Sequence, residues 1–244
     1  MSEQVKVYRD LVFTGDGNNG VNVEGNPNPK RIFREWNFKE LALDETNQYT
    51  KFIDTTSAVA LADDGITLTT AATDTKTCSY AFGGIHVLCA KNPVVEFHFQ
   101  IDVITTIAIN AGLTDAVTEA SAALPFTISG TTVSDTASNA AMFCFDTEQT
   151  TDRWYIVNTK ANAEGGTLLS ALEAPFAPAT NIRVRVRLDS TGKAWYYFNE
   201  KPVGVVKPNA TTAATALVPY FGIRNNSAAA HIATLRYVRL WEDA

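Results

Sequence analysis

Two segments of the chain alternate apolar and polar residues with a period of two, which is typical of a strand with one buried face. In the segment Ile182–Asp189 every second residue is apolar, and arginines stand at positions 183, 185 and 187 between them. In Val94–Asp102 a valine, two phenylalanines and an isoleucine alternate with polar residues. A shift of one residue would expose the whole apolar set, so each segment has a defined core face. The pattern predicts that four residues of the first segment point into one core: Ile182, Val184, Val186 and Leu188.

Similar short apolar segments fill most of the remaining chain, and turn sequences such as those at Asp63–Gly65 and Asp189–Gly192 separate them. The predicted strands are Ser57–Leu61, Ile66–Thr70, Cys78–Phe82, Ile85–Cys89, Thr106–Gly112, Ala140–Phe145, Trp154–Asn158, Ala194–Phe198, Val203–Val206, Leu217–Ile223 and Ile232–Trp241. Many short strands with one apolar face indicate two antiparallel sheets packed face to face. The predicted fold class is therefore all-β, an antiparallel β-sandwich or jelly roll that forms a single domain over residues 32–244.

Two segments outside this pattern are expected to lack strands. Residues 33–52 indicate irregular or short helical structure, in which Trp36 and Phe38 serve as packing anchors. The segment Thr114–Leu124 has the only longer stretch with a helical period, and it could make a few turns.

The first 31 residues differ from the rest of the chain. After an alternating stretch they run through a segment crowded with Gly, Asn and Pro, which cannot bury enough apolar surface to fold alone. We expect residues 1–31 to form an extended N-terminal arm, ordered only against its own body or a neighbouring subunit. The alternating stretch could add a strand to a sheet edge. Its candidate interface residues are Val5, Val7, Tyr8, Leu11 and Phe13.

The composition narrows the possible functions and partners. Charged residues make up 19% of the chain and the formal net charge is −6, which argues against nonspecific binding to nucleic acid or to anionic membranes. We see no secretion signal and no stretch of about 18 apolar residues. Cys78, Cys89 and Cys144 lack the spacing of a zinc site and are predicted to be buried thiols, although a bridge between the first two stays open.

The alternating arginines Arg183, Arg185 and Arg187 are the most unusual charged feature, because like charges on one face of a strand repel. Two explanations remain open at this stage. Either neighbouring strands supply Glu and Asp, or another subunit does. The three arginines are therefore further candidate interface residues.

Three longer segments resemble a known fold: NIRVRVRLDSTGKAWYYFNEKPVGVV (181–206), KNPVVEFHFQIDVITTIAINAGLTDA (91–116) and AAMFCFDTEQTTDRWYIVNTKA (140–161). They are similar to the strand units of concanavalin A-like and laminin G-like jelly rolls, and in combination they resemble structural proteins of tailed bacteriophages. The resemblance implies a capsid decoration, or cement, protein on the virion surface. Such a protein would be made in the host cytoplasm, bind the major capsid protein or other virion proteins, and form a homo-oligomer, a trimer at a symmetry axis.

The alternative function is a carbohydrate-binding, lectin-like module of a phage tail or fibre, with a glycan as partner. Aromatic residues at positions 154, 155 and 195–197 could form a platform for sugars. Adjacent positions on a strand face opposite sides, so about half of these residues should be core.

No catalytic constellation is visible, and we predict that the chain is not an enzyme. Glucanases of this fold class carry acids at alternate residues of one strand, because two carboxylates must flank the glycosidic bond. The matching positions here are Glu96, His98 and Gln100, which depart at two of three places and should form a polar ladder instead.

Metal and cofactor sites are not expected either. His86, His98 and His231 stand in separate segments without ligand spacing. The loop Asp16–Gly20 lacks the glutamate of a calcium site. Three acidic residues at strand ends could hold a calcium ion or simply cap turns; they are Asp115, Asp146 and Asp152.

Overall fold

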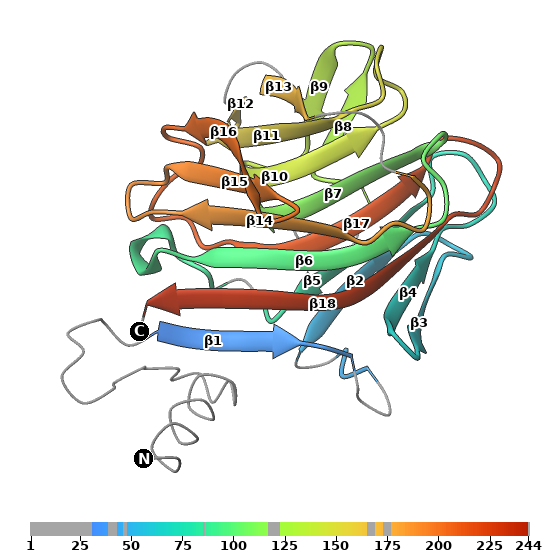
Figure 1. Ribbon diagram of the computed structural model, residues 1–244, viewed down its shortest axis with the longest axis horizontal. Coiled ribbons are helices and arrows are strands. Elements are labelled where there is room, and N and C mark those ends of the chain that lie inside the picture. The colour runs from blue at the N-terminus through green and yellow to red at the C-terminus, as the bar shows by residue number, and fades with distance from the viewer. Residues whose placement is uncertain are drawn as a thin grey trace.

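The computed structural model describes residues 31–38, 43–45, 48–84, 86–116, 123–164, 169–172 and 177–243. These residues form two large antiparallel sheets that pack face to face, as the alternating pattern predicted (Figure 1). A separate two-stranded hairpin, β8 (Phe126–Ser129) and β9 (Thr132–Asp135), accompanies them. No helix within the described ranges has the length and hydropathy needed to cross a membrane.

The first sheet contains the two strands whose alternation was clearest. Its order is β16-β15-β14-β6-β18-β4-β3, and β1 pairs with β18 beside β4. The strands are β1 (Arg31–Trp36), β3 (Ala58–Ala62), β4 (Gly65–Thr69), β6 (Val94–Ile101), β14 (Ile182–Leu188), β15 (Ala194–Phe198), β16 (Lys201–Lys207) and β18 (Ile232–Asp243).

The second sheet has the order β12-β11-β10-β7-β17-β5-β2, and β13 pairs with β11. Its strands are β2 (Tyr49–Ile53), β5 (Thr77–Phe82), β7 (Ile107–Thr114), β10 (Asn139–Asp146), β11 (Trp154–Lys160), β12 (Ala163–Glu164), β13 (Leu169–Leu172) and β17 (Val218–Asn225). In the middle of both sheets, strands distant in sequence are neighbours, such as β6 and β18 or β7 and β17, as in a jelly roll.

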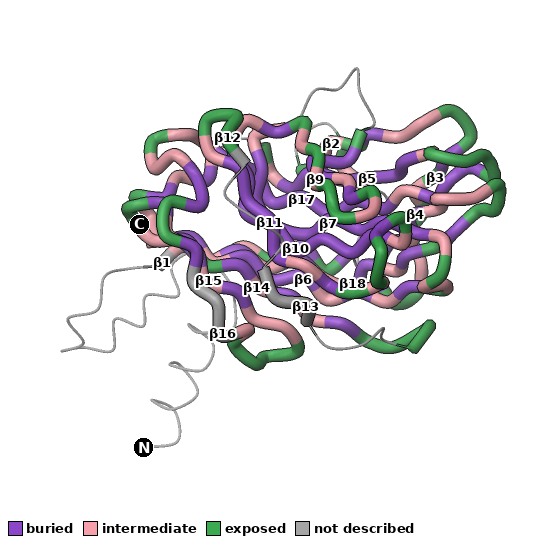
Figure 2. The backbone as a smooth tube through the Cα atoms, turned by 90° about the horizontal axis from the view of Figure 1, so that it is seen from above, coloured by how far each residue is buried: buried purple, intermediate pink, exposed green. Residues whose placement is uncertain are grey.

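The main core lies between the two sheets. Ile182, Val184, Val186 and Leu188 are fully buried, so the predicted core face of β14 is confirmed. Apolar residues of β6 meet the second sheet, where the rings of Phe99 and Phe221 lie 4.9 Å apart between centroids. Figure 2 shows this buried layer between the sheets, with exposed residues at the turns. Each large side chain buried there contributes about 1.5–3 kcal/mol of transfer free energy.

The two sheets differ in what covers their outer faces. A second apolar cluster covers the second sheet, where side chains of the β8–β9 hairpin such as Phe126 and Ile128 pack on Met142 and Cys144. Every residue of β7 and β10 is consequently buried. On the first sheet, by contrast, the outward residues of β14 are half-buried or exposed. The outer face of the first sheet is therefore the accessible one.

Two predictions about local structure were wrong. In the described part of the predicted strand Ile85–Cys89, residues 86–89, the chain forms only an isolated bridge at Val87, followed by a 3₁₀ helix, Cys89–Lys91. Gly83 and Gly84, both at positive φ, turn the chain just before it. Residues 33–52 were expected to lack strands, yet they contribute most of β1 and part of β2. Both strands lie at an edge of their sheet and carry apolar residues on both faces, so their sequences do not alternate apolar and polar residues. Trp36 and Phe38 are buried anchors, as predicted.

The three cysteines are free and buried, as predicted, and no bridge joins Cys78 to Cys89. Burial raises the pKa of the Cys78 thiol to about 12. The predicted arm, including Val5, Val7, Tyr8, Leu11 and Phe13, lies outside the described residues except for Arg31, where β1 begins. Most of the predicted helical turns also lie outside them, since residues 117–122 are not described.

Candidate functional site

Strand register aligns outward side chains into rows across the accessible face of the first sheet. Arg185 of β14 lies opposite Tyr197 of β15 on one side and opposite Glu96 of β6 on the other. Glu96 in turn faces Arg239 of β18. Directly opposed residues on one face have Cβ atoms about 5 Å apart, so these groups form one continuous row.

Glu96 is the centre of this row and is almost fully buried. Its Oε2 accepts hydrogen bonds from Arg185, with the Nε donor at 2.8 Å, and its Oε1 accepts one from the Tyr237 hydroxyl at 3.0 Å. Arg239 Nη1 lies 4.0 Å from the same Oε1. Burial, followed by the nearby Glu96 charge, raises the pKa of Tyr237 to about 12. The row is therefore a fixed network whose charges are paired.

The structure shows which partners the arginine stripe has; this stripe consists of Arg183, Arg185 and Arg187. Neighbouring strands supply Glu96 to Arg185, and the turn after β15 supplies Glu200 to Arg183. Arg187 differs, because no carboxylate in the described part of the chain lies within ion-pair distance of it. Its guanidinium carbon instead lies 5.1 Å from the ring centroid of Trp195.

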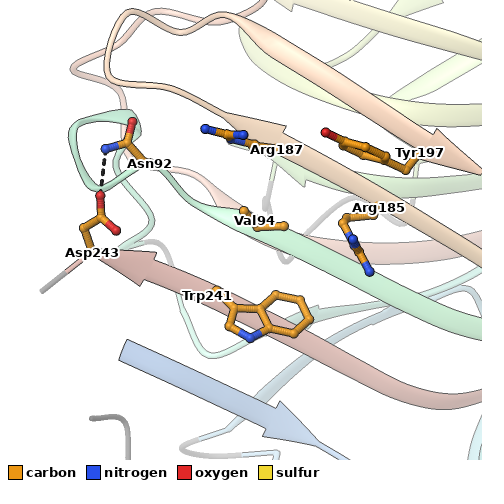
Figure 3. A pocket seen from close by; sticks show the side chains of 7 residues that line it. All are labelled: Asn92, Val94, Arg185, Arg187, Tyr197, Trp241 and Asp243. Atoms are coloured by element: carbon orange, nitrogen blue, oxygen red, sulfur yellow. Dashed lines mark hydrogen bonds between the residues drawn. The ribbon is translucent and has the colours of Figure 1, made fainter. Parts of the chain in front are cut away.

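A hollow of about 560 Å³ opens on this face. Seven of the described residues line it: Asn92, Val94, Arg185, Arg187, Tyr197, Trp241 and Asp243. Figure 3 shows Arg185 reaching from β14 across β6 toward Trp241. The Trp241 ring also contacts Phe33 of β1, at 5.4 Å between centroids. The hollow thus combines two aromatic rings with planar polar groups.

The loop after the 3₁₀ helix closes one end of the hollow. Asn92 takes a left-handed conformation with φ of 46°, which ends the helix and turns its side chain to the sheet edge. Its Nδ2 donates to Asp243 at 2.8 Å, the bond drawn in Figure 3, and its Oδ1 accepts from the Ser190 backbone at 3.1 Å. Asp243 is therefore held in place by the loop.

A second, smaller hollow of about 260 Å³ lies further along β14, lined by His98, Asn181, Arg183, Asn199 and Glu200. Burial, then the nearby Arg183 and Arg236, holds the pKa of His98 below its ordinary value of 6.5. Arg183 and Arg187 are four residues apart on one strand, a separation of about 13 Å. The two hollows thus lie in line on the same face.

The aromatic platform predicted from sequence divides as expected. Trp154 and Tyr196 are buried in the core, whereas Trp195 and Tyr197 point to the accessible face. Trp241, Asn92 and Asp243 were not predicted as site residues. The alternation of Tyr237, Arg239 and Trp241 along β18 was the signal that could have found Trp241.

The other polar candidates have structural roles. Asp115 accepts hydrogen bonds from the backbone of Ser138 and Asn139, and Asp146 accepts one from Ile128, so both hold loops. His231 lies within hydrogen-bond distance of Thr106, at 2.9 Å, and His86 contacts Arg34. Within the described ranges no three His, Cys, Asp or Glu side chains gather as metal ligands would.

The strand that matches glucanase catalytic positions carries a network rather than an acid pair. Glu96 and His98 face outward, and Gln100 accepts a hydrogen bond from Arg236 at 3.2 Å. The next carboxylate in the row is Glu35, which pairs with the far side of Arg239. Two carboxylates flanking a bond, as glycoside hydrolysis requires, are not brought together here by β6 and β1. That the chain is not an enzyme stays a prediction.

No protein-family profile matches the chain, and no curated protein matches it. Solved structures do match. Peanut lectin superposes with a TM-score of 0.59 at 12% identity, over 87% of this chain and 97% of the lectin. The metal-free Emp46p carbohydrate recognition domain gives 0.58 at 7% identity, over 84% and 94%. Crh5 transglycosylase in complex with NAG gives 0.56 at 12% identity, over 87% and 84%.

The fold is a concanavalin A-like β-sandwich. This confirms the fold that the sequence resemblance implied. Identities this low carry the fold and not the activity, because this fold hosts unrelated functions. None of these likenesses bears on a phage origin, a capsid role or a trimer, which stay predictions from sequence.

Proposed function

We propose that the chain is a carbohydrate-binding, lectin-like domain that holds a glycan on the accessible face of its first sheet. One observation carries the proposal: the 560 Å³ hollow in which Tyr197 and Trp241 lie among Asn92, Arg185, Arg187 and Asp243. Its volume falls within the range of small-molecule sites.

The chemistry of this hollow suits a sugar ring. A pyranose presents apolar C–H groups on its faces, and an aromatic ring buries them from water. Its hydroxyls lie around the edge, where amide, carboxylate and guanidinium groups can each make two hydrogen bonds. Tyr197 and Trp241 supply the apolar surface, and Asn92 with Asp243 supplies an acceptor and donor pair.

The site is also organised before a ligand arrives. Arg185 is held by Glu96, Asp243 by Asn92, and Trp241 packs on Phe33. Groups that are already ordered lose little conformational entropy on binding. Proteins of the same fold support the proposal, since they include a lectin, a carbohydrate recognition domain and a transglycosylase in complex with NAG.

A glycan array with the purified protein tests this function. We expect binding to one class of saccharide and its loss in the variant Trp241→Ala, because that variant removes half of the aromatic surface. Ile232→Ala is the matched control, since Ile232 is exposed on the same strand at its other end. Binding that Trp241→Ala leaves intact, or no binding to any saccharide, would contradict the proposal.

A further inference from the structure

Among the residues that the structure describes, Arg187 is the arginine of the stripe without an acidic partner within ion-pair distance. Arg183 and Arg185 each pair with a glutamate, and Arg239 pairs with Glu35. Arg187 is exposed on the rim of the hollow, where its guanidinium stacks on the ring of Trp195. A guanidinium is always charged and offers paired donors that match a carboxylate. Its donors are thus open to a ligand.

Two positively charged side chains lie against the Trp195 ring beside the hollow. The Lys193 ammonium nitrogen lies 4.9 Å from the centroid of the Trp195 ring, and the Arg187 guanidinium carbon lies 5.1 Å from the same centroid. The acidic group at that turn is Asp189, whose Oδ1 accepts hydrogen bonds from the backbone of Thr191 and Lys193. The stacking restrains the Arg187 side chain, so its paired N–H donors lose little conformational entropy when they bind a ligand.

Among the described residues that line the hollow, Asp243 supplies the one carboxylate, and it stands at one end. Asp243 is bonded to Asn92 there, whereas Arg185 and Tyr197 lie at the other end, with Arg187 between (Figure 3). The hollow is therefore polarised. Its Asn92–Asp243 end suits hydroxyl groups, and its middle, where the guanidinium of Arg187 lies, suits an anion.

We infer that this hollow takes an acidic saccharide, a sugar bearing a carboxylate that forms a paired hydrogen bond with Arg187. The inference rests on the proposed function and names its ligand class. The protein has a formal net charge of −6, so an anionic ligand gains nothing from overall attraction. Recognition must come from this local arginine, and salt should weaken it.

The test uses an array on which every acidic oligosaccharide stands beside its carboxyl-reduced, neutral counterpart, with sulfated sugars as a third arm. We expect the acidic sugar to bind and its reduced counterpart to bind about tenfold or more weakly, since hydrogen bonds to charged groups are the strong ones. Equal binding of a neutral glycan, lost in Trp241→Ala, would overturn this inference and leave the proposed function standing. Binding to sulfated sugars alone would also overturn it, and no binding at all would overturn both.

Arg187→Gln should reproduce the loss seen with the reduced sugar, and it should remove the salt dependence of binding. Arg187→Lys keeps the charge but removes the paired donors of the guanidinium, and we expect an intermediate affinity. Arg236→Gln is the matched control, because Arg236 lies on the same sheet face, pairs with Asp64, and lines neither hollow. Unchanged affinity in Arg187→Gln would contradict the inference.

Discussion

Glu96 of β6 and Arg185 of β14 lie opposite each other on the accessible face of the first sheet, and Arg185 donates two hydrogen bonds to one carboxylate oxygen. The side chain of Glu96 is only 6% exposed, whereas that of Arg185 is 36% exposed. The pair therefore fixes an arginine at the floor of the hollow.

We expect Glu96→Gln to lower the free energy of unfolding by about 1–2 kcal/mol, since Arg185 then loses its partner but keeps access to water. Glu200→Gln removes the partner of Arg183 and is the control. Glu200 is 63% exposed, so this change should cost less than about 0.5 kcal/mol. Urea denaturation measures both, and equal effects would contradict the assigned role of Glu96.

The core face of β14 gives a second prediction. Val186→Asp places a charge without a partner between the sheets, and it should prevent folding or cost about 4 kcal/mol or more. The adjacent change Arg187→Asp puts the same group on the opposite face, and that variant should fold. Circular dichroism and thermal melting compare the two. A soluble Val186→Asp protein with an unchanged melting temperature would mean that the register is wrong.

Stability should fall on mild acidification because of His98. Its lowered pKa means that the folded protein favours the neutral imidazole, so the unfolded chain binds more protons. The stability is therefore present above the ordinary pKa of 6.5 and is lost as the pH falls through the lowered value. Burial, then Arg34, lowers the pKa of His86 in the same direction. His98→Gln should reduce the slope of the unfolding free energy against pH between about pH 7 and 5 without abolishing it. An unchanged slope would exclude His98 as a cause of the pH dependence.

Because a second hollow lies in line with the first, we predict that the affinity of the protein for a saccharide depends on the length of that saccharide. A chain that runs along β14 can occupy both hollows once it spans about 13 Å. His98→Ala should then weaken binding of long oligosaccharides and leave the shortest ligands unaffected. Calorimetric titration with a series of lengths measures this. An equal loss at every length would show that the second hollow is not a separate subsite.

The fold was predictable where one strand face is buried and the other is open. The alternation at Ile182–Asp189 and Val94–Asp102 gave the strands, their core faces and the sandwich, and even which arginines share a face. It could not give strand β1, because Phe33 and Trp36 lie on opposite faces and both are apolar.

The hollow itself was less predictable from the sequence. Asn92, Trp241 and Asp243 come together only because β18 lies beside β6 and the loop after the 3₁₀ helix turns onto the sheet edge. Such long-range pairing leaves no local pattern in the sequence. The partners of the arginine stripe depend on the same pairing, so the sequence alone does not distinguish partners on neighbouring strands from partners on another subunit.

The most direct test of the carbohydrate-binding face is a titration followed by NMR of the four tryptophan indole N–H signals. Two of these side chains, Trp195 and Trp241, lie on the accessible face of the first sheet, whereas Trp36 and Trp154 are buried in the core. Addition of the saccharide identified on the array should shift the Trp241 signal most and the Trp195 signal next, and it should leave the Trp36 and Trp154 signals in place. Saturable binding that leaves the Trp241 signal unmoved would show that the glycan site lies elsewhere.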